Sequence, residues 1–101
     1  MAYQYEKMAE TAKKVKALLE KKGQSAAIKT SRYQTQIKAL EVAYNGTLEQ
    51  LIKSAGIAAT IKDITPTEEK AISGKYKAKL VTISSASSGI ARGETFFLLN
   101  T

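Results

Sequence analysis

The residues of this 101-residue chain that are best suited to binding chemistry lie in its last third. Lys75, Lys77 and Lys79 alternate with other residues, so a β-strand would place their ammonium groups on one face. A serine-rich loop and Arg92 follow. Proteins contact the phosphates of nucleic acids with such lysine, arginine and hydroxyl groups, and the ring of Tyr76 can stack on a base. The predicted phosphate-binding surface comprises Lys75, Tyr76, Lys77, Lys79, Ser84, Ser85, Ser87, Ser88 and Arg92.

The same residues have a purely structural interpretation. Alternating lysines on a strand also protect the edge of a sheet against pairing with other chains. A loop of serine and glycine is commonly a flexible connector. Both interpretations stay open at the level of the sequence.

The types of residue that most enzymes use are missing. Histidine and cysteine are absent, which removes the usual pairs of nucleophile and base, thiolate metal sites and disulfides. No spacing recommends a dyad of Lys79 with a serine of the loop. Asp63 followed by Glu68, Glu69 and Lys70 faintly resembles the carboxylate and lysine set of metal-dependent nucleases, but a helix-capping role explains Glu68. We predict no catalytic residue, metal or cofactor in this chain, and a catalytic domain further along a longer protein stays an open alternative.

The charge of the chain favours anionic partners. Lys and Arg outnumber Asp and Glu by 16 to 9, which gives a formal net charge of +7. Residues 1–29 alone carry seven Lys against three Glu. The field of such a surplus attracts polyanions, although charge also simply keeps proteins in solution. No apolar run approaches the roughly 20 residues of a membrane span, so we expect no membrane partner. The absence of cysteine allows a reducing compartment, and the first residues lack a signal-peptide core, so the expected location is intracellular, cytoplasmic.

The first half of the chain predicts helices. Tyr5, Met8, Ala12, Val15 and Leu19 follow helical spacing, which indicates a helix over residues 3–22 that ends at Gly23. Residues 26–29 form a short extended piece. A second helix is expected over residues 32–44, with its apolar face made of Tyr33, Ile37, Leu40 and Tyr44.

The second helix has a rival interpretation. Leu40, Val42 and Tyr44 also alternate as in a strand, and Asn45-Gly46 is the preferred two-residue hairpin turn. The residues after Gly46 fit a helix better than a returning strand, so the helix is preferred over the hairpin.

Capping boxes and turn residues divide the rest of the chain. Such boxes occur at Ser31/Gln34, Thr47/Gln50 and Thr65/Glu68. The middle one starts a third helix over residues 48–55, which a strand over 57–64 follows. The last one starts one or two helical turns over 66–72. Strands over 75–83 and 94–100, joined by a loop at 84–89, complete the prediction.

The expected fold class is α+β, with three N-terminal helices followed by an antiparallel β-hairpin in a small sheet. This order of elements resembles a winged-helix module, a variant of the helix-turn-helix, with residues 75–100 as the wing. The resemblance implies a DNA-binding domain. The third helix offers little for reading bases, since its exposed positions are Glu49, Gln50, Lys53 and Ser54. We therefore expect a single small basic domain over 1–101 that binds nucleic acid, DNA in particular, mainly through phosphate contacts.

The end of the chain supports an alternative function. Phe96-Phe97-Leu98-Leu99 is apolar on both faces of a strand and lies next to the C-terminus. Such a strand is normally interior or covered, which indicates either a fragment of a longer protein or a terminal strand tucked into the sheet. The alternative is a protein–protein interaction or oligomerisation domain, which accepts a partner strand near residues 96–100 or forms a homo-oligomer.

Overall fold

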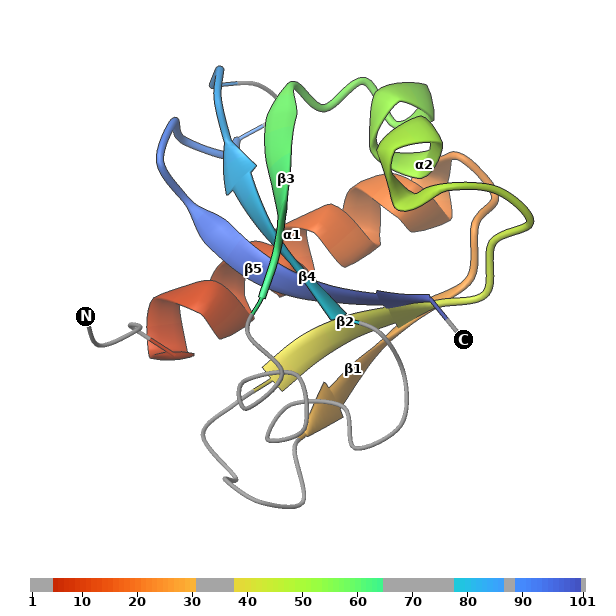
Figure 1. Ribbon diagram of the computed structural model, residues 1–101, viewed down its shortest axis with the longest axis horizontal. Coiled ribbons are helices and arrows are strands. Elements are labelled where there is room, and N and C mark those ends of the chain that lie inside the picture. The colour runs from red at the N-terminus through yellow and green to blue at the C-terminus, as the bar shows by residue number, and fades with distance from the viewer. Residues whose placement is uncertain (1–4, 31–37, 65–77, 87–88, 101) are drawn as a thin grey trace.

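The computed structural model of the chain describes residues 5–30, 38–64, 78–86 and 89–100. Within these ranges it contains two helices and five strands, and the strands form one mixed sheet (Figure 1). In chain order the elements are α1 (Tyr5–Lys21), β1 (Ala26–Thr30), β2 (Lys38–Val42), α2 (Leu48–Ser54), β3 (Ala59–Asp63), β4 (Ala78–Ile83) and β5 (Thr95–Asn100).

The strands lie in the order β1-β2-β5-β4-β3, so the last strand of the chain is the middle strand of the sheet. β2 and β5 are parallel, and the other neighbouring pairs are antiparallel. Leu98 of β5 lies opposite Leu40 of β2 and Lys79 of β4. The two outer strands of the described sheet are β1 and β3.

The composition of β5 fits this central place. Phe96, Phe97, Leu98 and Leu99 are all buried, because a strand with neighbours on both sides and cover on both faces reads as a continuous apolar run. β5 is thus tucked into the sheet between β2 and β4. The prediction that β5 offers a free edge to a partner is wrong, since β2 and β4 flank it.

The larger part of the core joins both helices to one set of alternating strand residues. Alternate residues of a strand share a face, and Leu40, Val42, Phe96, Leu98 and Val81 belong to one face by their register. They form a buried cluster with Ala12, Val15 and Leu19 of α1 and with Leu51 and Ile52 of α2. Figure 1 shows α1 passing behind the sheet, and α2 near the end where α1 leads into β1.

A smaller cluster lies on the alternate strand positions. It consists of Met8 from the first turns of α1 with Ala39, Phe97 and Leu99. Tyr5 packs against this cluster and Tyr44 against the larger one. The helical stripe predicted for α1 is confirmed.

Two helix boundaries that the sequence marked, the end of α1 and the start of α2, are confirmed. Gly23 adopts φ +84° directly after α1, and the Gln24 N–H donates to the carbonyl of Leu19 at 2.9 Å. At the start of α2, Gln50 N–H donates to Thr47 Oγ1 at 3.1 Å and Thr47 N–H donates to Gln50 Oε1 at 3.1 Å, which is a complete capping box. The boxes at Ser31 and Thr65 lie outside the described residues.

The predicted second helix over 32–44 is wrong, and with it the arrangement of three helices and a hairpin. Residues 38–42 are β2, while 32–37 lie outside the described residues. Leu40 fits either period, but Val42 is buried on the same face, which only a period of two achieves. The backbone of β2 pairs with β1 on one side and with β5 on the other. The rival interpretation is right that the residues before Asn45-Gly46 form a strand, β2. Its hairpin is wrong, because α2 and not a returning strand follows Gly46.

The winged-helix arrangement does not survive this correction. The strands over 57–64, 75–83 and 94–100 are confirmed in their described parts as β3, β4 and β5, and β4 and β5 do form the expected antiparallel pair. That pair is built into the centre of a five-stranded sheet, so it cannot project as a wing. The helical turns predicted over 66–72 lie outside the described residues.

Candidate functional site

The described part of the predicted phosphate-binding surface is divided between the two ends of β4. Lys79 lies near the start of β4, and its ammonium group forms an ion pair with Asp63 of β3. Ser84 follows the end of β4, and a strand of five residues spans about 16 Å. The structure therefore does not bring Lys79 together with Ser84. Lys75, Tyr76, Lys77, Ser87 and Ser88 lie outside the described residues.

The remaining predicted residues are solvent-accessible. Ser84, Ser85 and Arg92 are exposed, and the backbone N–H of Ser84 donates to the carbonyl of Ala58 at 3.0 Å, which extends the ladder between β3 and β4. The structural alternative for the lysines, protection of a sheet edge, does not hold for Lys79, because β4 lies between β3 and β5.

Glu94 anchors the turn between β4 and β5 to α1, a role that the sequence did not reveal. One carboxylate oxygen accepts from the Ala91 N–H at 2.5 Å, and the other accepts from Thr11 Oγ1 at 3.1 Å and Lys14 Nζ at 3.2 Å. Burial acts to raise the pKa of Glu94, but the hydrogen bonds from Ala91, Lys14 and Thr11 outweigh it, so the pKa is lowered. Lys14 is thereby held in an ion pair with Glu94.

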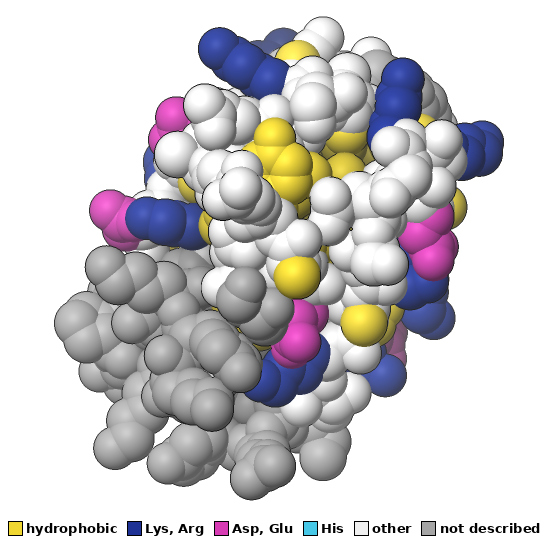
Figure 2. Space-filling view, turned by 90° about the vertical axis from the view of Figure 1, so that its right-hand side faces the viewer, with side chains coloured by type: hydrophobic (Ala, Val, Ile, Leu, Met, Phe, Trp, Pro, Cys, Tyr) yellow, Lys and Arg dark blue, Asp and Glu magenta, His cyan; other side chains and the backbone are white. Residues whose placement is uncertain are grey.

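The cationic surplus is spread over several elements of the described chain. Ion pairs join Lys16 to Glu20 at 3.0 Å and Lys29 to Glu41 at 3.8 Å. On the face shown in Figure 2, Lys and Arg side chains lie around the periphery, acidic side chains lie among them, and hydrophobic atoms are visible between. In the described ranges the cations without an ion pair are Lys7, Lys13, Lys21, Lys22, Lys38, Lys53, Lys62 and Arg92.

The outer edge of β3 is a different feature, and it has the geometry of a binding site. The hydrogen bond from Ser84 to Ala58 fixes which residues of β3 face β4. Because hydrogen-bonding pairs alternate along an antiparallel ladder, Thr60 and Lys62 point their backbone groups at β4. Ala59 and Ile61 then direct their N–H and C=O groups away from the sheet. Such a row is a template on which another strand can pair.

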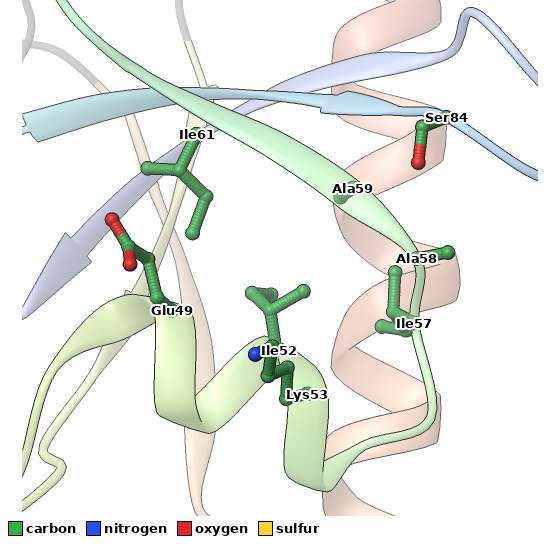
Figure 3. A pocket seen from close by; sticks show the side chains of 8 residues that line it. All are labelled: Glu49, Ile52, Lys53, Ile57, Ala58, Ala59, Ile61 and Ser84. Carbon is green, nitrogen blue, oxygen red and sulfur yellow. The ribbon is translucent and has the colours of Figure 1, made fainter.

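A hollow of about 310 Å³ lies between this edge strand and α2. Ile52 and Ile57 are buried at its base, and Ile61 is half-buried. Figure 3 shows Ile61 and Ile52 pointing towards one another, with Glu49 beside Ile61 and Lys53 one turn further along α2. The residues that line the hollow are Glu49, Ile52, Lys53, Ile57, Ala58, Ala59, Ile61 and Ser84.

The edge and the hollow together match a known mode of recognition. When an extended segment adds to a sheet edge, main-chain hydrogen bonds provide affinity, and a pocket beside the edge selects alternate side chains. The strand over 57–64 was predicted, but its place as the outermost strand of the described sheet was not. That place depends on the strand order, which pairing across the whole chain decides.

Comparison with known proteins gives no match to a family model, to a curated protein or to a solved structure. Within the residues that the structure describes, neither α1 nor α2 is long and apolar enough to cross a lipid bilayer.

Proposed function

We propose that this chain is a protein-interaction module that binds an extended segment along β3. The observation that carries the proposal is the outward-facing backbone of Ala59 and Ile61 beside the apolar hollow under α2. This is the alternative function that the sequence left open, placed at a different strand. The intracellular, cytoplasmic location expected from the sequence stays a prediction.

The two parts of the site have separate roles in this proposal. The N–H and C=O groups of Ala59 and Ile61 pair with the backbone of the bound segment, whatever its sequence. An apolar side chain of that segment enters the hollow and covers the exposed part of Ile61. Glu49 and Lys53, which are exposed at the rim, favour opposite charges on the segment, since rim charges act chiefly on specificity and association rate.

A displayed library of random octapeptides tests this function. We expect selected peptides to alternate apolar with polar residues and to bind at least about tenfold more weakly to Ile61→Pro, because proline removes the outward N–H and one hydrogen bond to a partner contributes about 1.4 kcal/mol, a factor of ten. That N–H is not used within the sheet, so the variant should keep its fold by circular dichroism.

The matched control is Ile61→Val, which keeps the edge N–H and a β-branched side chain. Its affinity should stay within about fourfold of the original, since the loss of one methylene is worth about 0.8 kcal/mol or less. A library that yields no peptide dependent on the N–H of residue 61 would contradict the proposal.

Phosphate-mediated binding of nucleic acid, DNA in particular, is the second candidate function. The net charge of +7 supports it. The expected site includes Lys75, Lys77 and Arg92, of which Arg92 is described and exposed.

The test is fluorescence anisotropy with an arbitrary DNA duplex at about 50 and 200 mM salt. Binding through several phosphates should weaken by about tenfold or more at the higher salt, because counterions are released on binding. Replacing Lys75, Lys77 and Arg92 with Glu should abolish DNA binding. Replacing Lys7, Lys13 and Lys22 with Glu makes the same change in net charge elsewhere on the chain and should weaken DNA binding less. Equal losses in both triple variants would remove the assignment to the hairpin.

A further inference from the structure

We infer that the segment bound along β3 is the β3 strand of a second copy of this chain, so that two sheets join edge to edge around a two-fold axis at Thr60. The inference rests on the proposed function, because it names the partner of the same edge. Its support comes from the register, the charges at the rim and the side chains that would meet.

The register follows from the groups that point outward. A two-fold axis at Thr60 sets Ala59 of one copy opposite Ile61 of the other, and the reverse. Both residues direct N–H and C=O away from their own sheet, so each pair can exchange two hydrogen bonds, as residues opposite each other in an antiparallel ladder do. The closed two-fold arrangement leaves no further edge of β3 for a third copy.

The side chains of β3 suit this register. Thr60 faces its own counterpart across the axis on one side of the joined sheet, a pair that is favourable between strands. Lys62 falls opposite Ala58 of the second copy, so no two like charges meet. A two-fold axis centred on Lys62 would set two ammonium groups directly opposite each other, which is destabilising. The charge on Lys62 therefore favours the register centred on Thr60 over the register centred on Lys62.

On the other side of the joined sheet, the apolar residues of the two hollows would form one seam. Ala59 and Ile61 point to the side that α2 covers, because their partners in β4, Ile83 and Val81, belong to the same core cluster. Side chains opposite each other across a ladder lie about 4.5–5.5 Å apart at Cβ. Each Ile61, half-buried in one copy, would be covered by Ala59 and the hollow of the other.

The same two-fold axis brings opposite charges at the rims of the two hollows to the same side. Glu49 lies beside Ile61, and Lys53 lies further along α2 in the direction of Ile57 (Figure 3). Neither side chain has an ion pair within the described chain. The two-fold axis exchanges the Ile61 end of one hollow with the Ala59 end of the other. Glu49 of each copy is thereby placed on the side of Lys53 of its partner.

The proposed interface is small, because it comprises only the short strand β3 and the turn of α2 from Glu49 to Lys53. Interfaces below about 1,200 Å² are typical of weak association, so we expect the dimer to form at micromolar to millimolar concentration. Sedimentation equilibrium from about 10 µM to 1 mM should show the mass rise from 10.9 kDa towards twice that value.

Two sets of variants test the partner and the register. Thr60→Lys places two ammonium groups opposite each other at the axis, so the dimer dissociation constant should rise at least tenfold. The control is Thr60→Gln, whose side chain is neutral and similar in length to that of lysine. It should leave the dissociation constant within about threefold of the original value. Glu49→Lys and Lys53→Glu should each weaken the dimer, whereas the double variant Glu49→Lys with Lys53→Glu should restore it. The double variant should restore dimerisation because both copies carry both substitutions, so the lysine introduced at position 49 of each copy again meets the glutamate introduced at position 53 of the other. A different partner protein would keep its own charges and would not be restored in this way.

The outcomes separate this inference from the proposed function. A chain that stays monomeric at 1 mM but selects peptides that depend on the N–H of Ile61 overturns the second copy and leaves the interaction module standing. A monomer that selects no such peptide overturns both. A dimer that Thr60→Lys leaves unchanged overturns the register and the edge contact, because that dimer must form elsewhere. A dimer weakened by Thr60→Lys and restored by the double charge exchange supports the inference.

Discussion

Replacing Phe96 with alanine is expected to lower the free energy of unfolding by about 3–5 kcal/mol. Phe96 is 0% exposed in the middle strand of the sheet. It lies opposite Val81 of β4 and belongs to the cluster that joins α1, α2 and the sheet. The truncation removes the transfer free energy of the ring and leaves a cavity that the surrounding strands can fill only in part.

Urea denaturation followed by circular dichroism measures the loss for Phe96→Ala. Phe96→Leu is the matched control, because it keeps most of the apolar volume and should cost markedly less. A hairpin that projected as a wing would bury this ring poorly, and its truncation would then cost about 1 kcal/mol or less. A loss that small for Phe96→Ala would contradict the central position of β5.

Val42→Asp is expected to destabilise the protein by at least about 3 kcal/mol. Val42 is 2% exposed, and burying a valine side chain contributes about 1.5–3 kcal/mol. The substitution also places a carboxylate in the core, where an unpaired charge is strongly disfavoured. Part of the cost should appear as a raised pKa of the new carboxyl group, so the loss should be smaller at low pH.

The control for this substitution is Ala43→Asp, because Ala43 is the next residue and is exposed. Its effect should stay within about 0.5 kcal/mol, as for most surface substitutions. In the helix that the sequence predicted over 32–44, Val42 would lie about 200° around the axis from Leu40 and would face solvent. Equal, small effects of the two substitutions would therefore favour that helix over β2.

Local signals predicted the elements whose structure is decided locally. The stripe from Tyr5 to Leu19 and Gly23 define α1, and the capping box of Thr47 with Gln50 defines the start of α2. The apolar run from Phe96 to Leu99 marked a strand with cover on both faces. Each of these signals depends on residues close together in the sequence, so each could be read without the strand order.

Residues 38–42 were mispredicted because their pattern satisfies two periods at once. Leu40 and Tyr44 fit one face of a helix, while Leu40 and Val42 fit one face of a strand. The partner that decides between them is β5, whose Leu98 lies opposite Leu40 and is separated from it by more than half of the chain. Tertiary pairing of this kind overrides a local helical preference. One wrong element was enough to produce the winged-helix order.

The candidate site escaped prediction for a related reason. The alternation of Lys75, Lys77 and Lys79 was visible, but the register that brings Asp63 to Lys79 was not. The exposed edge of β3 is invisible in the sequence, because an outer strand is defined by the absence of a neighbour. Its composition offers one hint in hindsight: Thr60 and Lys62 give β3 a polar face, as is common in edge strands.

Amide hydrogen exchange along β3 tests the open edge and its partner most directly. In dilute solution the N–H groups of Thr60 and Lys62 should be protected by β4, while those of Ala59 and Ile61 exchange rapidly. At millimolar concentration Ala59 and Ile61 should exchange more slowly, in proportion to the fraction of chains whose β3 is paired with a second copy. Equal exchange rates along β3 in dilute solution would contradict the open edge. Exchange rates at Ala59 and Ile61 that do not change with protein concentration would contradict its pairing with a second copy.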